Sequence, residues 1–330
     1  MDEKIDVLLA TYNGEKYLKE QIDSILNQTY KNIRIVISDD CSKDTTRKIL
    51  EEYENKDARI KVHYQEKNLG VVKNIEFLLG QVEAPYYMLA DQDDYWMKEK
   101  IQKSIETLKK ENADLVFGDL EVVDEKLNTM YDSFNDYMLL SRNIRKYINS
   151  YKVNYLYNCV TGCTILAKKR TIEKIHPLPT DSKYLIHDHW IGLMVGLNGK
   201  LAYMPEKYIK YRQHGNNQVG TEKISHGFKK LGQVRELFIN VKLGVFGTYV
   251  ANSEKFPKEL QKQNKEAYKY YEMLTKKKNF NFRGWTTFHK LYKTETFKYY
   301  LENFMIMNMP IIARGLFNIR YAILKLMGKR

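Results

Sequence analysis

The first 110 residues alternate between short apolar runs and segments of helical length, and this alternation limits the folds open to the chain. The runs are rich in Val, Ile, Leu and Tyr, which is typical of buried strands. Strands that alternate with amphipathic helices indicate βαβ units, and so an α/β fold on a largely parallel sheet. The predicted strands are residues 5–10, 33–37, 60–64, 86–90, 113–118 and 200–204, and the predicted helices are residues 16–28, 45–55, 71–80 and 98–110.

A cluster of polar residues follows each of the first four predicted strands. These clusters are Thr11–Asn13, Asp39–Asp44, Asn68–Gly70 and Asp91–Asp94. Ligands of parallel sheets bind outside the carboxyl ends of the strands, so we expect the clusters to meet at one edge and to hold a nucleotide-sized ligand. The glycine fingerprint of dinucleotide sites and the Gly-Lys-Ser/Thr phosphate loop are both absent from the sequence. A diphosphate bound here would therefore need a metal ion.

The sequence Asp91-Gln92-Asp93-Asp94 places three carboxylates at the end of a buried strand. Neighbouring like charges disfavour one another's ionisation, so the group indicates a bound cation. Mg²⁺ and Mn²⁺ prefer oxygen ligands and retain waters, so one or two carboxylates suffice. We assign Asp93 as the principal ligand, Asp91 as a second ligand acting directly or through water, and Asp94 as a helix cap. The alternative is an acidic turn that only caps the following helix.

Five separated motifs resemble those of family 2 glycosyltransferases, in the same order and spacing. They are Val7–Gly14, Ser38–Ser42, Asn68–Gly70, Asp91–Asp94 and His187–Trp190. The resemblance covers about residues 4–217. It implies the nucleotide-diphospho-sugar-binding fold called GT-A, a Rossmann-like, mostly parallel sheet flanked by helices, and inverting, metal-dependent sugar transfer. Together with the later Tyr-Arg-Gln-His-Gly-Asn-Asn run, the motifs are most similar to bacterial rhamnosyltransferases of capsule and cell-wall polysaccharide synthesis.

The resemblance assigns the nucleotide to residues near the first strands. Asp40 matches the carboxylate that binds the base, where it would accept the N3 hydrogen of uracil or thymine; the alternative is an Asx turn or a helix N-cap. Thr11, Tyr12 and Asn13 match the loop that packs against the nucleoside, and without the resemblance they would indicate a simple turn. Lys73 would add positive charge near the phosphates, unless it is an ordinary surface lysine.

The resemblance also implies a general base. Asp188 matches the carboxylate that removes the acceptor hydroxyl's proton in a single inverting displacement. Its alternative role is a helix N-cap. His187 and Trp190 flank it as substrate contacts, with Trp190 stacking on a sugar ring; taken alone, each would indicate packing.

A second loop is implied near the end of the resembling region. Arg212 and His214 match a loop that closes over the diphosphate, where His214 would ligate the metal and Arg212 would contact substrate. The alternative is a loop held by hydrogen bonds. Residues 124–158 are rich in Tyr and Asn and are expected to be an irregular loop over the site that selects the sugar.

The positive charge of the chain belongs to its last third. Residues 221–330 hold 22 Lys+Arg against 8 Asp+Glu, a net charge of +14 within a total of +13. We therefore expect a catalytic domain at residues 1–220 and a basic helical region at residues 221–330. Within the latter, residues 312–329 have the spacing of an amphipathic basic helix, which favours either an anionic membrane surface or packing on the catalytic domain or a second subunit.

Several sequence signals that would indicate export, membrane insertion or nucleic-acid binding are absent, and we base the expected localisation and partners on this. Cys41, Cys159 and Cys163 are odd in number and lack metal-type pairing, and no secretion signal or membrane-spanning run is evident. We expect a cytoplasmic protein, peripheral on the inner membrane surface, with a homo-oligomer left open as an alternative to a monomer. A basic tail also suggests nucleic acid, but no recognised binding motif is present, so no nucleic-acid partner is expected.

The predicted reaction is transfer of a hexose or deoxyhexose, with rhamnose favoured over glucose or galactose, from a dTDP- or UDP-sugar to a hydroxyl of a lipid-linked saccharide. Two alternatives differ in class. A nucleotidyltransferase of similar fold would need a glycine-rich loop with Arg and Lys, which residues 10–15 lack. A scaffold or basic nucleic-acid-binding protein would not need both the metal and the base positions occupied.

Overall fold

The computed structural model describes residues 3–138, 145–180, 182–215, 231–276 and 282–292. The chain divides into two compact units. One unit comprises Met1–Asp181 and Ile186–Thr221, and the other Ser182–Leu185 and Glu222–Arg330.

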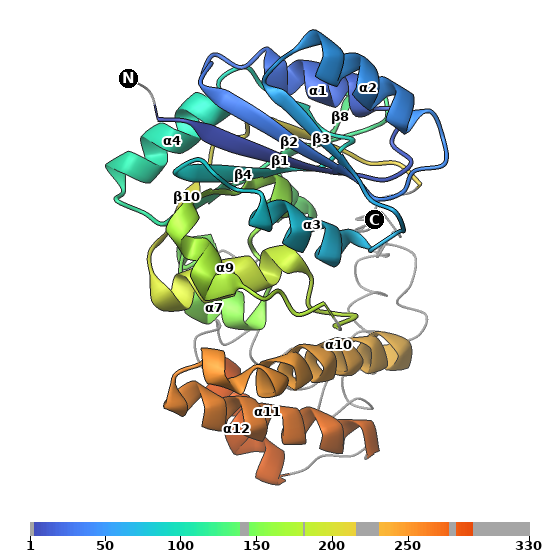
Figure 1. The fold of residues 1–330 in the computed structure, drawn as a ribbon. Coiled ribbons are helices and arrows are strands. Elements are labelled where there is room, and N and C mark those ends of the chain that lie inside the picture. The colour runs from blue at the N-terminus through green and yellow to red at the C-terminus, as the bar shows by residue number, and fades with distance from the viewer. Residues whose placement is uncertain (1–2, 139–144, 181, 216–230, 277–281, 293–330) are drawn as a thin grey trace, which may run out of the picture. The chain divides into compact units, whose positions relative to one another are not determined.

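Among the described residues of the first unit, seven strands form one mixed sheet with the order β10-β6-β9-β4-β1-β2-β3 (Figure 1). β1 is parallel to both β2 and β4, and β9 is antiparallel to both of its neighbours. The strands are β1 (Ile5–Thr11), β2 (Ile33–Asp39), β3 (Ile60–Tyr64), β4 (Tyr86–Ala90), β6 (Leu115–Gly118), β9 (Leu166–Lys168) and β10 (Leu201–Met204). All six predicted strands are therefore present.

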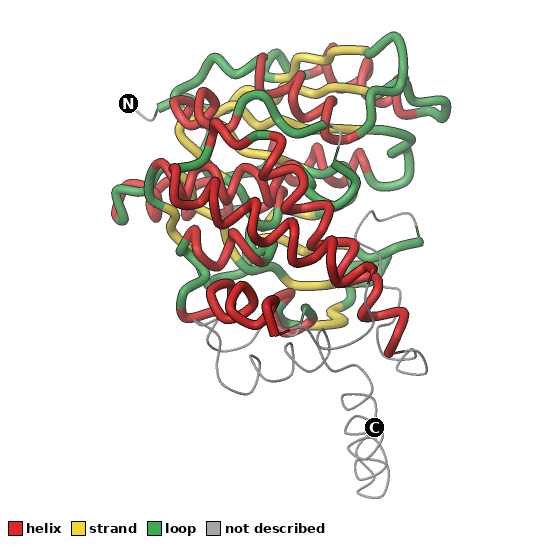
Figure 2. The backbone as a smooth tube through the Cα atoms, turned by 90° about the horizontal axis from the view of Figure 1, so that it is seen from below, coloured by secondary structure: helices red, strands yellow, loops and turns green. Residues whose placement is uncertain are grey.

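Helices cover both faces of this sheet, and α1 and α2 lie on the face opposite α3 and α9 (Figure 1). Apolar side chains from α1, α2 and α4 join alternate residues of β1 (Ile5, Val7 and Leu9) in one buried core. The strands lie side by side as a group, with helices and loops around them (Figure 2). The helices are α1 (Leu18–Leu26), α2 (Thr46–Lys56), α3 (Val71–Gly80), α4 (Lys100–Lys110), α8 (Ile172–Ile175) and α9 (His187–Asn198).

A smaller sheet stands beside the first, with the strand order β5-β11-β7-β8 in the described chain. It comprises β5 (Tyr95–Trp96), β7 (Glu121–Val123), β8 (Thr129–Tyr131) and β11 (Ile209–Arg212). β11 is antiparallel to β5 and parallel to β7, so the segment after β4 reaches the end of β11. The expectation of an irregular segment at residues 124–158 is wrong in part, because it contains β8, α5 (Phe134–Tyr137) and α7 (Tyr151–Leu156).

The described part of the second unit is helical. It contains α10 (Leu231–Ala251), α11 (Lys258–Lys276) and α12 (Phe282–Tyr292). Aromatic contacts join α10 to α11, where the rings of Phe246 and Tyr271 stack with centroids 5.6 Å apart. No helix in the described ranges has the length and apolar content needed to cross a bilayer. The amphipathic helix predicted at residues 312–329 lies outside the described residues.

Candidate active site

The carboxyl ends of β1 and β4 are held together by one side chain, Gln92. Its Oε1 accepts hydrogen bonds from Thr11 Oγ1 at 2.6 Å and from the Tyr12 backbone N–H at 2.9 Å. Its Nε2 donates to the Tyr12 carbonyl at 3.0 Å. A Cβ atom at Gly14 would lie 2.3 Å from Gln92 Oε1, so a larger residue there would displace the Gln92 side chain from these hydrogen bonds. The sequence suggested no role for Gln92, which sets the separation of these two polar clusters.

The loop after β1 is also tied to the loop after β2. The Asn13 N–H donates to Ser42 Oγ at 2.8 Å, and Asn13 Oδ1 accepts from the Lys43 N–H at 2.8 Å. Asn13 has a φ of 48° and Cys41 a φ of 66°, the left-handed region that asparagine tolerates better than most residues. Tyr12 remains 44% exposed at the rim between them.

Asp40 joins the end of β2 to the start of α3. Its two carboxylate oxygens accept the backbone N–H groups of Leu69 at 2.6 Å and Gly70 at 2.9 Å. The Asx-turn and N-cap alternatives for Asp40 are wrong, because other carboxylates make those bonds: Asp39 accepts the Ser42 N–H, and Asp44 accepts the Thr46 N–H. Base binding by Asp40 stays a prediction.

Lys73 lies in the first turn of α3, which starts directly after the third polar cluster. Its side chain is exposed. The structure therefore leaves it free to reach a ligand at the rim, and its contact with phosphate stays a prediction.

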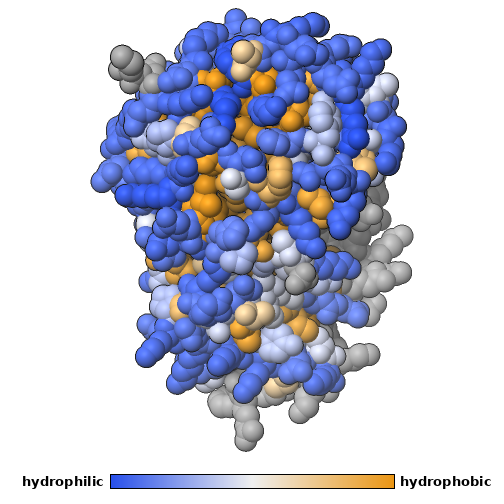
Figure 3. Space-filling model, in the orientation of Figure 1, coloured by the Kyte–Doolittle hydropathy of each residue, from blue (hydrophilic) through white to orange (hydrophobic). Residues whose placement is uncertain are grey.

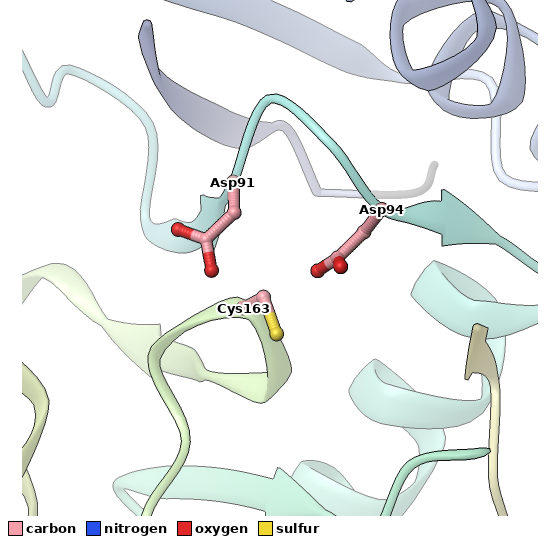
Figure 4. A group of neighbouring side chains, drawn as sticks. All are labelled: Asp91, Asp94 and Cys163. Atoms are coloured by element: carbon pink, nitrogen blue, oxygen red, sulfur yellow. The ribbon is translucent and has the colours of Figure 1, made fainter. Parts of the chain in front are cut away.

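The acidic segment after β4 gathers its carboxylates against a thiol. Oxygens of Asp91 and Asp94 and the sulfur of Cys163 all lie within 4.8 Å of one another (Figure 4). The predicted helix cap at Asp94 is wrong. β5 intervenes before α4, whose N-cap is Glu99, and Asp94 is fully buried with Oδ1 accepting the Arg212 N–H at 3.3 Å.

The electrostatics of this cluster favour a cation. Burial, followed by the charges of Asp93 and Asp188, raises the pKa of Asp91 to about 7. Burial, followed by the charges of Asp93 and Asp91, raises the pKa of Asp94 well above its usual range. The Oδ2 atom of Asp94 has no hydrogen-bond partner in the described chain. Burial also raises the pKa of the Cys163 thiol. The carboxylates therefore fit Mg²⁺ or Mn²⁺, whereas the protonated thiol is a poor ligand for either.

A buried lysine lies behind the acidic cluster. Lys100 is 1% exposed, its Nζ lies 3.3 Å from the centroid of the Trp96 ring, and it has no hydrogen-bond partner among the described residues. Burial lowers the pKa of Lys100 to about 7, opposed by the charges of Cys163, Asp94 and Asp91. Nothing in the amino-acid sequence distinguishes Lys100, because it is one of several lysines in this stretch.

His214 meets the acidic segment from the end of β11. Its Nε2 lies 2.8 Å from Asp93 Oδ2, and its ring packs on that of Tyr17 with centroids 5.0 Å apart. The structure thus pairs His214 with Asp93, whereas the side chains close enough to share an ion are Asp91, Asp94 and Cys163. Ligation itself stays a prediction.

Arg212 was predicted to contact substrate from a loop, and this is wrong. It ends β11 and is 2% exposed. Its guanidinium donates to the carbonyls of Asp93 at 2.9 Å and Glu125 at 2.5 Å, and to the carboxylate of Glu20. These protein partners occupy the guanidinium, so Arg212 holds the acidic segment in place rather than binding diphosphate.

Asp188 lies in the first turn of α9 and is 7% exposed. Its Oδ1 accepts from Asn158 Nδ2 at 2.9 Å and from the His189 N–H, and its Oδ2 accepts from the Gly162 N–H at 3.2 Å. The helix-cap alternative is wrong, because the N-cap is Ile186. Burial raises the pKa of Asp188, and its charge in turn contributes to the raised pKa of Asp91, so the two carboxylates face one site.

The residues flanking Asp188 differ in their surroundings. Trp190 is fully buried and its indole N–H donates to the Ile175 carbonyl at 2.8 Å. The prediction that Trp190 stacks on a sugar is therefore wrong, because neither ring face is accessible. His187 is 9% exposed, and burial lowers its pKa, which favours the neutral imidazole. Its Nδ1 has no partner in the described chain, so a substrate contact by His187 stays a prediction.

Comparison with known sequences supports the same assignment. The family model described as "Glycosyl transferase family 2" matches residues 6–175, more than half of the chain. An uncharacterized glycosyltransferase of Haemophilus influenzae is 30% identical over 214 residues, which are 64% of this chain and 66% of that protein, slightly less than two thirds. The dTDP-rhamnosyl transferase RfbG of Shigella flexneri is 30% identical over 240 residues, 69% of this chain and 79% of that protein.

Solved structures show the same fold. The S. aureus TarS 1–349 complex with UDP-GlcNAc matches with a TM-score of 0.55 and 19% identity, over 81% of this chain and 72% of that chain. The mannosyltransferase PcManGT from Pyrobaculum calidifontis, in complex with GDP-Man and Mn²⁺, matches with a TM-score of 0.54 and 12% identity, over 100% of this chain and 89% of that chain. The predicted GT-A fold class is confirmed.

Proposed function

Since this chain belongs to glycosyl transferase family 2, we propose that it transfers a sugar from a nucleotide-diphosphate donor to a hydroxyl group of a saccharide, with inversion at the anomeric carbon. The observation that carries the proposal is the meeting of two carboxylate groups of different kinds at one site. Asp91 is crowded by Asp94 and by the charge of Asp93, which pairs with His214, while Asp188 is held on α9 by hydrogen bonds.

The donor would lie along the carboxyl ends of the strands. Asp40 would accept the N3 hydrogen of the base, with Thr11, Tyr12 and Asn13 beside the nucleoside and Lys73 near the phosphates. This arrangement suits uracil or thymine, and therefore UDP- or dTDP-sugars. The likeness to the Shigella rhamnosyltransferase favours dTDP-rhamnose, with glucose and galactose as the next candidates.

Asp91, Asp93 and His214 would hold a divalent cation, Mg²⁺ or Mn²⁺. When bound, the ion would offset the charge that develops on the departing nucleoside diphosphate. Two hydrogen bonds hold the acidic segment in place: Arg212 donates to the Asp93 carbonyl, and Gln92 donates to the Tyr12 carbonyl in the loop after β1. Because these bonds are made by backbone and buried side chains, the carboxylates need little reorganisation on binding.

Asp188 would act as the general base. Its carboxylate would take the proton of the acceptor hydroxyl while that oxygen bonds to the anomeric carbon and the bond from that carbon to the diphosphate oxygen breaks. Burial raises the pKa of Asp188, which makes its ionised form a stronger base than an exposed aspartate. The bonds from Asn158 and Gly162 fix the direction of its oxygens.

The acceptor we propose is a lipid-linked saccharide of capsule or cell-wall synthesis, reached at the cytoplasmic face of the membrane. In this proposal residues 1–220 are catalytic and the basic residues 221–330 provide membrane association or a contact with a second copy. Family membership and the paired metal and base positions support this function over nucleotidyl transfer, a scaffold or nucleic-acid binding.

Screening of nucleotide sugars tests the proposal. dTDP-rhamnose, UDP-glucose and UDP-galactose are incubated with the protein, with Mn²⁺, Mg²⁺ or a chelator, and release of nucleoside diphosphate is measured. We expect slow hydrolysis of at least one donor that requires the metal. Absence of binding to every uridine and thymidine nucleotide, in the presence of either metal, would contradict the proposal.

A further inference from the structure

One face of α11 carries a row of four lysines. Lys258, Lys262, Lys265 and Lys269 follow one another at intervals of four, three and four residues, which places them on the same side of a helix. All four are exposed. Their backbone positions span about 16 Å along the helix axis, from the rise per residue. We call these four residues the α11 lysine row.

The opposite face of α11 is its buried face. Ala267, Tyr271 and Leu274 are buried there, together with Asn264. Since the lysine row lies across the helix from these residues, it is not part of the buried face of α11 within the described residues. Hydrophilic residues also dominate the described part of this unit on the face seen in Figure 3.

The row lacks counter-charges in the part of the chain that the structure describes. Two other described lysines of the unit form ion pairs: Lys276 with Glu272 at 3.2 Å and Lys290 with Glu266 at 3.2 Å. No described carboxylate forms an ion pair with any of the four lysines in the row. The four lysines line one shallow hollow with Gln261 and Glu266, and Glu266 is the residue already engaged by Lys290. The row is therefore a concentration of uncompensated positive charge.

We propose that the α11 lysine row binds the anionic headgroups of a lipid bilayer and so brings the enzyme to a lipid-linked acceptor. This inference rests on the proposed function, because an enzyme that acts on a lipid-linked saccharide must work at the bilayer surface. Four ammonium groups in a line match a surface of many negative charges better than a single phosphate. The row has no apolar member, so binding is electrostatic and falls as salt rises.

Vesicle co-sedimentation of the full chain tests the inference. The probe is phosphatidylcholine vesicles containing about 30% phosphatidylglycerol, compared with pure phosphatidylcholine, at about 0.1 M salt. The test variant replaces all four row lysines by Gln, which has nearly the same helix propensity as lysine. We expect at least about a tenfold loss of binding to the anionic vesicles. A variant with Arg at the four positions should retain binding.

The matched control removes the same charge elsewhere. Lys4, Lys31, Lys48 and Lys110 are exposed in the first unit and have no ion pair there among the described residues, and their replacement by Gln gives the same net charge. This control should bind within about twofold of wild type. Equal losses in both variants, or unchanged binding in the row variant, would overturn the proposal. So would a loss of single-stranded oligonucleotide binding in the row variant with vesicle binding intact.

The failure of this inference is distinguishable from failure of the proposed function. Metal-dependent donor hydrolysis in vesicle-free solution should be the same in wild type and the row variant, since α11 contributes no residue to the candidate active site. If wild type hydrolyses a donor but the row variant still binds anionic vesicles, only the surface assignment is wrong. If the wild type binds vesicles through the row but neither binds nor turns over any donor, the proposed function fails.

Discussion

Asp91 is the residue whose chemistry depends most on its neighbours. Asp91 is half-buried. Desolvation of its carboxyl, followed by the charges of Asp93 and Asp188, raises its pKa to about 7. Without a metal, the folded protein therefore holds a proton at Asp91 that the unfolded chain releases at lower pH. Protonation of Asp91 therefore stabilises the folded protein. This contribution to the free energy of unfolding is complete below pH 3.8, the pKa of the unfolded chain, and is lost as the pH rises through about 7.

Asp91→Asn removes this titration. With a chelator present, the free energy of unfolding of the variant is compared with that of wild type at about pH 5 and at about pH 8. We expect this difference to move in favour of the variant at the higher pH, by on the order of 1 kcal/mol. Urea unfolding at the two pH values measures it. Asp124→Asn is the control, because the hydrogen bond from Asn128 lowers the pKa of exposed Asp124, and the variant should show no such gain. If Asp91→Asn changed the free energy of unfolding by the same amount at both pH values, the raised pKa of Asp91 would be contradicted.

The carboxylates of the site were accessible to prediction from the sequence because they follow apolar runs at strand ends. Asp91 and Asp93 were found in this way, whereas Asp188 was found through the family resemblance; the charges of Asp93 and Asp188 both raise the pKa of Asp91. Gln92 was missed because its partners Thr11 and Tyr12 are 81 and 80 positions away. Lys100 was missed because its burial arises from the fold and leaves no local pattern. Asp94 was misassigned because a two-residue strand, β5, separates it from the helix.

At the scale of elements, β11 links the smaller sheet to the acidic segment. Arg212 makes this link through Asp93, Glu125 and Glu20, and its guanidinium also lies 4.5 Å from the Tyr17 ring centroid. The family resemblance placed this residue in a loop that closes over the diphosphate. Pairing of β11 with β5 and β7, which are distant in the sequence, places it in a strand instead.

Replacing Arg212 should therefore affect stability and metal affinity together. We expect Arg212→Ala to cost roughly 2–4 kcal/mol in unfolding free energy, because it leaves buried carbonyls unpaired, and to weaken Mn²⁺ binding by displacing Asp93. Arg212→Lys should recover little, since an ammonium cannot serve three divergent partners.

The control for Arg212 is Arg59→Ala. Arg59 pairs with Asp57 two residues away, and both side chains are partly exposed, so its loss should cost at most about 1 kcal/mol. Thermal unfolding and Mn²⁺ titration measure both effects. An Arg212→Ala protein of wild-type stability with reduced affinity for nucleoside diphosphate would instead support the direct substrate contact.

The α9 helix offers a second test at this scale. Trp190 is part of its packing face, so we expect Trp190→Ala to destabilise the protein by about 3–5 kcal/mol. Trp190→Phe should fold, with the KM for donor unchanged. Tyr12→Ala is the contrasting variant: the ring is 44% exposed at the nucleotide rim, so its loss should raise the KM for donor with little change in stability. A raised KM in Trp190→Phe alone would restore the sugar-stacking role.

At the scale of the whole molecule, charge is divided unevenly along the chain. Residues 1–220 carry a net charge of −1 and residues 221–330 carry +14. The alternation of apolar runs was enough to predict the α/β fold and the strands of the main sheet. The smaller sheet was missed because its strands have two to four residues, too few for a periodic signal, and are paired by long-range contacts. The surface of α11 likewise requires a structure, which shows what each lysine faces.

The most direct test of the central claim is the kinetic effect of Asp188→Asn. Asparagine keeps the size of the side chain and cannot take the acceptor proton, so with the donor found in the screen we expect kcat for transfer to fall by about 10²–10⁴-fold. The Kd for nucleoside diphosphate with Mn²⁺ should stay within about twofold of wild type. Transfer at a near wild-type rate, with nucleotide binding intact, would contradict the account.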